Sequence, residues 1–293
     1  MTAAGEPGVR RHGRLLVVGT PIGNLGDLSA RAAEALRTAD LVVAEDTRLA
    51  ARLLAHLGAR TPTLSFNDHN AAARLPGLLA RLAGGAKLAL TTDAGMPAVS
   101  DPGAELVAAA RAAGHGIESV PGPSAVTTAL ALAGIEASGF LFAGFLPARP
   151  VAARRAALER HLVAARGLGL PLVLYEAPNR VVGLLRELGA IVPDARVAAC
   201  RELTKRHEEV LAGRAAEVAA RLGEPRGEFT LVVGELARGP TDAPPILDAE
   251  GLVLAARAAG LRPRAVVELL RGAGLARREA YRLAQQPAPL RDR

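Results

Sequence analysis

The chain has 293 residues, of which 50% are hydrophobic and 2% aromatic, so Leu, Val and Ala must build most of its core. The formal net charge of +7 favours an anionic partner such as nucleic acid, although solvated helix faces account for part of it. The single cysteine, Cys200, excludes a disulfide framework or a zinc cluster of several thiolates within one chain.

The first 13 residues are polar, and we predict that they are disordered. They hold no apolar segment of the signal-peptide type, and no uncharged apolar run is long enough to cross a bilayer. We therefore expect a cytoplasmic protein that makes no membrane contact.

Short apolar runs alternate with stretches of helical spacing through most of the chain. This alternation predicts an α/β fold with parallel or mixed sheets. The expected strands are residues 15–18, 41–44, 63–66, 87–90, 116–120, 140–142, 172–175, 197–200, 207–212 at an edge, and 230–233.

The turn Pro121-Gly122-Pro123 divides two halves of similar size. We predict an N-terminal α/β domain at 14–122, a C-terminal α/β domain at 123–238, and a linker with a basic helical extension at 239–293. Residues 239–246 are rich in proline, and helical spacing follows from Leu252 to Gln286. The extension is either a nucleic-acid arm or packing at a dimer interface.

Glycine-rich or polar loops follow the expected strands. The first, at 19–27, lacks the spacing of a dinucleotide loop, places Pro21 where a donating backbone is needed, and is not followed by GK[ST]. After the second strand, Asp46 or Thr47 can cap a helix, and the charged cluster 45–48 is equally suited to a polar substrate. The loop at 67–70 holds His69 and ends at Asn70, a possible helix cap.

The loop at 91–103 carries the most detailed signal. Gly95 permits a positive φ, Pro97 removes a donor, and Asp93 and Asp101 lie beside open backbone groups. Open α/β sheets bind ligands at the carboxyl ends of their strands, so this loop is either a ligand site or an ordinary strand-to-helix connection. Further on, Ser124 can cap the next helix.

Arginines are concentrated at the start of the second half. The predicted helix at about 151–165 and the residues before it can contact phosphates, or can serve only to keep the helix solvated. The arginines concerned are Arg149, Arg154, Arg155 and Arg160.

Eight of these loops carry motifs that occur together in a known family. They are GTPIGNLGD, AEDTR, DAGMPAVSDPG, PGPSA, GFLP, YEAPNR, RELTK and GEF. In this order they resemble the bacterial ribosomal RNA small-subunit methyltransferase I group of the tetrapyrrole methylase superfamily, from about Arg14 to Glu235. The helical tail is also similar to the C-terminal extension of that group.

The resemblance implies S-adenosylmethionine (AdoMet) bound in a cleft between two unlike α/β domains, and a homodimer. It also implies methylation of a cytidine ribose 2′-hydroxyl in 16S rRNA of the small ribosomal subunit. The matching cofactor residues are Ile22, Gly95, Met96, Pro97, Val99, Ser124, Ala125, Tyr175, Leu203, Glu228, Phe229 and Thr230.

The chain departs from the pattern of the group at three places. Asn67 stands where the group usually has a second histidine, Leu49-Ala50 replaces His-Thr, and Ala177 and Asn179 replace Ser and His. These departures argue against a mechanism that needs a histidine at those positions.

A ribose hydroxyl is a poor nucleophile while protonated, so a base within hydrogen-bond reach would accelerate its attack. The candidate bases are Asp46, His69, Asp93, Asp101, Glu176 and Glu202, and transfer without a base is also compatible with the sequence. Lys205 and Arg48 can instead hold a phosphate or lower the pKa of the hydroxyl. No metal is required.

Two other functions remain open from the sequence. One is an AdoMet-dependent enzyme that methylates a porphyrin or corrin precursor. The other is a non-catalytic RNA-binding scaffold, whose binding would depend on salt and not on AdoMet.

Overall fold

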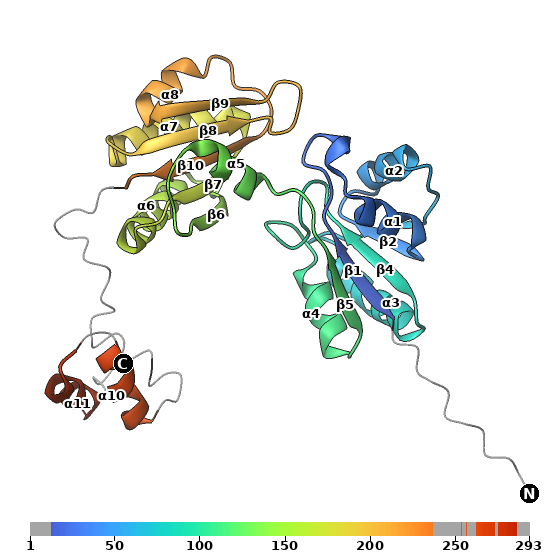
Figure 1. The fold of residues 1–293 in the computed structure, drawn as a ribbon, viewed down its shortest axis with the longest axis horizontal. Coiled ribbons are helices and arrows are strands. Elements are labelled where there is room, and N and C mark those ends of the chain that lie inside the picture. The colour runs from blue at the N-terminus through green and yellow to red at the C-terminus, as the bar shows by residue number, and fades with distance from the viewer. Residues whose placement is uncertain (1–12, 237–252, 254–255, 257–261, 273–274, 286–293) are drawn as a thin grey trace, which may run out of the picture.

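The computed structural model describes residues 13–236, 253, 256, 262–272 and 275–285. It consists of two lobes, each built on a five-stranded sheet, and a pair of C-terminal helices (Figure 1). The predicted α/β class, with two unlike domains and a helical extension, is confirmed. The predicted linker at 239–246 and the predicted disorder of residues 1–12 lie outside the described residues.

The first lobe holds a wholly parallel sheet in the order β3-β2-β4-β1-β5. Its strands are β1 (Arg14–Val18), β2 (Leu41–Ala44), β3 (Thr63–Ser65), β4 (Lys87–Thr91) and β5 (Gly116–Val120). The connecting helices are η1 (Leu25–Asp27), α1 (Ala30–Thr38), α2 (Thr47–His56), α3 (Ala71–Ala83) and α4 (Ala104–Ala112).

Successive residues of β1 belong to different cores. Leu15 packs with Leu78 and Leu106 of α3 and α4 on one face of the sheet, while Leu16 packs with Leu36 of α1 on the other. A parallel sheet covered on both faces needs apolar residues in both directions, which explains why these strands read as unbroken apolar runs.

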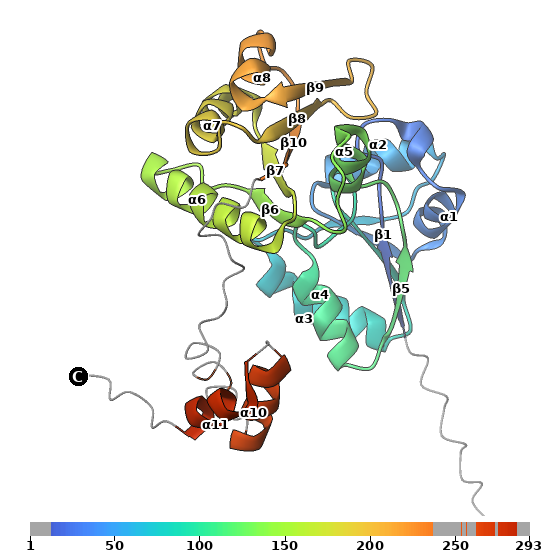
Figure 2. The same ribbon diagram turned by 60° about the vertical axis from the view of Figure 1, so that its left-hand side comes forward.

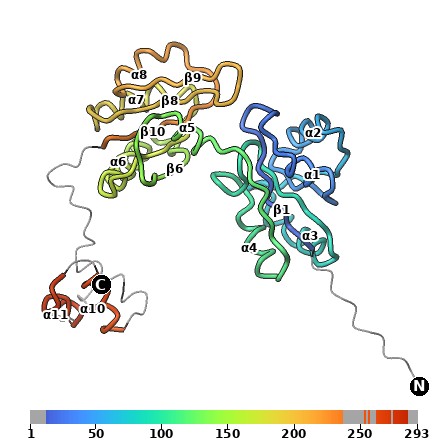
Figure 3. Tube along the Cα trace, viewed as in Figure 1, coloured from blue at the N-terminus to red at the C-terminus, as the bar shows by residue number. Residues whose placement is uncertain are grey.

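The second lobe holds a mixed sheet in the order β6-β7-β10-β8-β9. Its elements are α5 (Ala125–Ala133), β6 (Leu141–Phe145), α6 (Val151–Leu168), β7 (Leu172–Glu176), α7 (Pro178–Ile191), β8 (Arg196–Arg201), β9 (Glu209–Arg214), α8 (Ala215–Arg221) and β10 (Phe229–Gly234). Helices α6, α7 and α8 cover one face, and α5 covers the other (Figure 2). The trace enters this lobe through α5, directly after β5 and its proline turn (Figure 3).

Helices α10 (Pro263–Gly272) and α11 (Arg277–Gln285) form a small unit with its own apolar core. Val266, Leu270 and Leu283 are buried in that core. Within the described residues, no helix is both long enough and apolar enough to cross a membrane.

Three local predictions are corrected by the structure. Gly13 is ordered rather than disordered, because its amide donates to the carbonyl of Leu82 at 3.0 Å. Asn70 precedes α3 without capping it, since its Oδ1 accepts from the amide of Asn67 instead. Ser124 precedes α5 and also makes no capping bond. The cap at Asp46 is confirmed, because its carboxylate accepts from the amide of Arg48 at 2.8 Å.

The carboxyl ends of β1 and β5 approach so closely that both must carry glycine. A Cβ atom on Gly19 would lie 2.6 Å from the amide nitrogen of Gly122 and 2.7 Å from the sulfur of Met96. A Cβ atom on Gly122 would meet the backbone of Gly19 at 2.8 Å. This contact fixes where the two loops leave the sheet.

We expect Gly19→Ala to lower the free energy of unfolding by about 1–3 kcal/mol, as other overpacking substitutions do, because backbone atoms would have to move. Urea denaturation of the purified variant measures this change. Gly77→Ala is the matched control, since Gly77 is exposed on α3 and a Cβ atom there meets nothing within 4 Å. That control should be neutral or stabilising by about 0.5–1 kcal/mol. Equal stabilities of Gly19→Ala and the wild type would contradict the predicted steric requirement.

Candidate active site

Two loops of the first lobe are joined by a short antiparallel bridge. The amide of Thr20 donates to the carbonyl of Gly95 at 2.9 Å, and the amide of Gly95 donates back to Thr20 at 3.1 Å. The Thr20 hydroxyl also donates to the carbonyl of Thr92 at 3.1 Å. Gly95 adopts a φ of +83°, which its lack of a side chain permits. The loops after β1 and β4 therefore form one unit at the sheet edge.

A cavity of about 480 Å³ lies between this unit and the second lobe. The lobes come into close contact beside it at two places, where a Cβ atom on Gly23 would meet Lys205 and one on Gly144 would meet Ser100. The lining residues are Ile22, Glu45, Asp93, Ala94, Gly95, Met96, Val99, Ser100, Asp101, Ser124, Ala125, Phe145, Tyr175, Glu176, Ala177, Pro178, Leu203, Glu228, Phe229 and Thr230. We call it the interlobe cavity.

Most of the residues predicted to bind the cofactor line this cavity. Pro97 is the exception, because it is buried without contributing to the lining. Of the predicted catalytic residues, Asp101 and Glu176 line it, whereas Arg48, His69 and Lys205 do not. Sequence reasoning missed the role of Glu45 as a cavity residue and that of Phe145, although the AEDTR and GFLP motifs contain them.

Three carboxylates gather at the end of the cavity formed by the first lobe. Burial, helped by the charges of Glu45 and Asp93 and opposed by the Thr92 side chain, raises the pKa of Asp101 to about 6. Burial likewise raises the pKa of Asp93. The Thr92 hydroxyl donates to Glu45 at 2.9 Å and connects the group. Asp101 is therefore a stronger base than an ordinary aspartate and still ionises below neutral pH.

Asp101 faces the second lobe across the cavity. Burial raises the pKa of the Tyr175 hydroxyl, and the charges of Asp101 and Glu228 add to the shift. The ring of Tyr175 packs against Phe142 and Phe145, with centroids 5.0 and 5.3 Å away. The second lobe therefore presents an aromatic wall opposite the carboxylates.

Glu176 lies at the same wall but already has a charge partner. Its Oε1 accepts from Arg180 at 2.5 Å and from the amide of Ala177 at 2.8 Å. Its Oε2 is buried and has no hydrogen-bond partner among the described residues. The Glu176 side chain has no exposed surface, so this carboxylate lies beneath the wall of the cavity and is held by Arg180.

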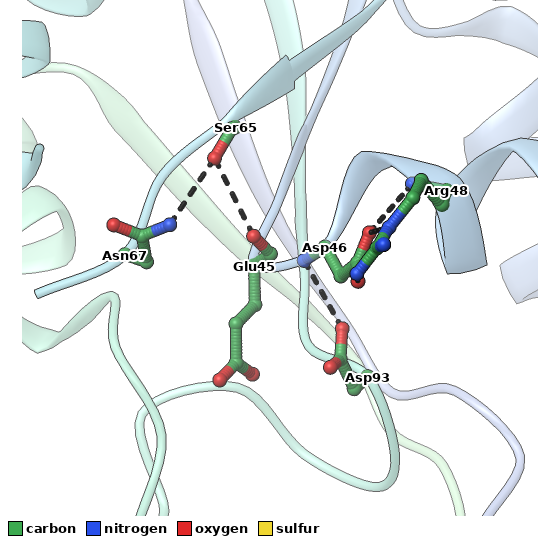
Figure 4. Close-up of polar contacts among 6 residues, drawn as sticks. All are labelled: Glu45, Asp46, Arg48, Ser65, Asn67 and Asp93. Atoms are coloured by element: carbon green, nitrogen blue, oxygen red, sulfur yellow. Dashed lines mark hydrogen bonds and ion pairs between the residues drawn. The ribbon is translucent and has the colours of Figure 1, made fainter. Parts of the chain in front are cut away.

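Asp46 begins α2 and pairs with Arg48 (Figure 4). Hydrogen bonds from the side chain and the amide of Arg48 lower the pKa of Asp46 to about 2, so its carboxylate is a poor base. Its own amide donates to Asp93 at 3.1 Å. Asn67, at the place of the missing histidine, donates to Ser65 and accepts from the amide of His69. His69 itself is exposed and lies outside the cavity.

Lys205 is held by carboxylates of the second lobe. Its ammonium group donates to Glu202 at 2.9 Å and to Glu228 at 3.0 Å. Burial lowers the pKa of Lys205, but these hydrogen bonds outweigh burial and the net shift is upward. Glu202 also accepts from the amide of Glu228, so Glu202 and Lys205 position the cavity residue Glu228. Among the described residues, no group of histidines, cysteines and carboxylates is arranged to hold a metal ion.

A family model for tetrapyrrole (corrin/porphyrin) methylases matches residues 14–219. The chain is 45% identical to the ribosomal RNA small subunit methyltransferase I of Xylella fastidiosa strain Temecula1, over 75% of this chain and 81% of that protein. It is 40% identical to the protein of the same name from Synechocystis, over 93% of this chain and 97% of that protein.

Solved structures of similar fold share less sequence with the chain. A cobalt precorrin-4 methyltransferase superposes with a TM-score of 0.57 at 18% identity, covering 79% of this chain and 99% of that one. Uroporphyrin-III C-methyltransferase of Thermus thermophilus, complexed with S-adenosyl homocysteine, gives 0.53 at 23% identity, covering 77% and 99%. At these identities the likeness extends to the fold alone.

The raised pKa of Asp101 predicts a stability effect of defined sign. The pKa of Asp101 is about 6 in the folded protein and 3.8 ordinarily, so the folded state binds this proton more strongly. The free energy of unfolding therefore falls as the pH rises from 3.8 through 6. Asp101→Asn removes the cost of ionisation. We expect its melting temperature to exceed that of the wild type at pH 7.5, with little difference at pH 4.

Differential scanning fluorimetry at both pH values measures this effect. Asp68→Asn is the control, since Asp68 is exposed and lies outside the cavity. A melting temperature for Asp101→Asn below that of the wild type at pH 7.5 would contradict the predicted unfavourable ionisation.

Proposed function

The chain belongs to the tetrapyrrole methylase family, and from this premise we propose that it transfers a methyl group from AdoMet to the 2′-hydroxyl of a cytidine ribose in 16S rRNA. The identity of 40–45% to proteins named ribosomal RNA small subunit methyltransferase I carries the proposal. The likeness to corrin and uroporphyrin methyltransferases lies below 25% identity and supports only the shared fold. The basic charge of the chain is in keeping with an RNA substrate.

The residues of the interlobe cavity fit AdoMet. The apolar side chains of Ile22, Leu203 and Phe229 suit an adenosine, and small residues such as Ala125 leave room for it. The carboxylates of Asp93, Asp101 and Glu228 in the lining suit a positively charged, hydrogen-bond-donating ligand. When bound, AdoMet supplies an electrophilic methyl group on sulfonium.

The contribution of the chain is to position the ribose hydroxyl and to accept its proton. Asp101 is the strongest candidate for the base, because it lines the cavity and has a pKa of about 6. A base of this strength is ionised at neutral pH and still takes up a proton more readily than an ordinary aspartate. Glu45 and Asp93 maintain that basicity through their charge.

The assembly and location of the protein follow from the same proposal. Phe140, Phe145, Val151, Val163 and Leu168 expose apolar side chains on or beside β6 and α6, and this surface is our candidate for a homodimer interface. Acting on ribosomal RNA places the protein in the cytoplasm.

Methyl transfer from labelled AdoMet to small ribosomal subunits and to their purified 16S rRNA tests the proposed function. We expect one cytidine to become 2′-O-methylated, with the site mapped by nuclease digestion and mass spectrometry. Transfer to uroporphyrinogen in place of RNA would support the tetrapyrrole alternative. Salt-dependent RNA binding with no transfer to either substrate would support the scaffold.

The pH dependence of transfer tests the role of Asp101. We expect kcat to rise with pH through an apparent pKa near 6 in the wild type and to fall by about 10²–10⁴-fold in Asp101→Asn, as for loss of a general base. Asp68→Asn should retain the wild-type profile. An unchanged kcat and profile in Asp101→Asn would remove Asp101 from the mechanism.

The cofactor assignment is tested by filling the cavity. The larger side chain of Ala125→Leu would occupy part of the interlobe cavity. We expect it to raise the Kd for AdoMet by at least about tenfold, a change that corresponds to only about 1.4 kcal/mol. Isothermal titration calorimetry measures the affinity. Ala131→Leu adds the same group to an exposed position of the same helix, α5, and should bind AdoMet like the wild type. Equal affinities in both variants would place the cofactor elsewhere.

A further inference from the structure

A second cavity, of about 300 Å³, opens beside the first, between the loop after β1 and helix α2. Its floor is formed by buried apolar residues of the first lobe, namely Leu36, Val42, Ala44 and Leu54. Leu25 and Leu49, which also line the cavity, are 47% and 39% exposed. An apolar hollow with exposed leucines at its opening suits the faces of a flat, weakly polar ligand. We call it the α2 cavity.

The two cavities share one wall. Asp93 lines both of them, Thr92 lines the α2 cavity, and Glu45, which accepts from Thr92, lines the interlobe cavity. The Thr92 side chain also interacts with Asp101, the candidate base, and lowers its pKa. The wall between the two cavities therefore lies beside the candidate base.

The polar groups of the α2 cavity distinguish between possible occupants. Asp93 uses Oδ1 to accept from the amide of Asp46, and its Oδ2 has no hydrogen-bond partner in the described part of the chain. Two carboxylates, Asp46 and Asp93, line the cavity and favour a group that donates hydrogen bonds. The side chain of Arg48 is 86% exposed in the first turn of α2, and the exposed Arg52 lines the α2 cavity itself, so both can meet a phosphate.

We propose that the α2 cavity receives the base of the nucleotide whose ribose is methylated, and that its rim favours a base with an exocyclic amino group. This inference rests on the proposed RNA methylation. A nucleotide has an apolar face, a donating edge, a ribose and a phosphate in sequence. The leucines suit the apolar face of a base, Asp93 suits its donating edge, and the exposed Arg48 and Arg52 of α2 suit a phosphate. Enzymes that modify a nucleotide commonly hold its base in such a pocket, and amino groups of cytosine and adenine donate to carboxylates.

A pair of variants on α2 tests the proposal. Ala50→Phe places a ring in the α2 cavity, whereas Ala51→Phe places the same ring on the exposed side of the helix, outside it. We expect Ala50→Phe to lower kcat/KM for 16S rRNA by about 10²-fold, because the ribose would no longer reach its productive position. AdoMet affinity should stay at the wild-type value, and Ala51→Phe should be fully active.

A second pair keeps the test decisive if Ala50→Phe does not fold. Leu49→Glu adds a negative charge at the opening from an exposed position, and Ala51→Glu adds the same charge outside it. We expect only Leu49→Glu to raise KM for the RNA. Saturation-transfer NMR with free cytidine gives an independent readout, and the signal should be lost in Leu49→Glu and kept in Ala51→Glu.

The outcomes separate this proposal from the proposed function. A wild-type protein that methylates no RNA would refute the function itself. An active wild type with equal activity in the α2 cavity variants and their controls would refute only the base pocket. A parallel loss of AdoMet affinity in Ala50→Phe or Leu49→Glu would assign the α2 cavity to the cofactor and also overturn the proposal.

Discussion

The backbone pairing of Thr20 with Gly95 is the interaction on which the site depends. Parallel strands deliver their loops to one edge of a sheet, but they do not fix how those loops lie toward one another. Two reciprocal amide bonds and the contact of Gly19 with Gly122 join the loops after β1, β4 and β5. The interlobe cavity lies on one side of this joined edge and the α2 cavity on the other.

The distribution of charge sets what can enter the two cavities. The chain carries a net charge of +7, yet five carboxylates line the interlobe cavity. Such a lining attracts a cation and repels phosphate, so an RNA strand can offer only its ribose and base there while its phosphates meet arginines outside. The carboxylates also raise one another's affinity for protons, as the pKa of Asp101 shows. In the proposed complex, the positive net charge of the chain therefore attracts the phosphates of the RNA, whereas the negative charge of the interlobe cavity acts on the ribose and the base.

The sequence predicted the class of fold and the positions of most strands along the chain, because apolar runs and turn residues are local signals, but it did not predict the order of the strands in each sheet. The residues predicted to bind the cofactor line one cavity, with Pro97 as the exception, and their role stays a prediction. The sequence did not rank the bases, since burial and neighbouring charge decide between Asp46, with a pKa of about 2, and Asp101, with one of about 6. Asn70 and Ser124 were predicted to cap helices and do not. The residue type allows such a cap, but the surrounding structure decides where a polar side chain makes its hydrogen bond.

The candidate base and the candidate cofactor pocket both depend on the contact between the two lobes. Asp101 belongs to the first lobe, while Tyr175, whose pKa its charge helps to raise, belongs to the second. Burial is the largest cause of the shift at Asp101, and the wall opposite it comes from β7. Separating the lobes would expose the carboxylate and return its pKa toward the ordinary value, because solvation stabilises the charged form. The strength of the candidate base is therefore coupled to the interlobe cavity, our proposed site for the methyl donor, because both depend on residues from the two lobes.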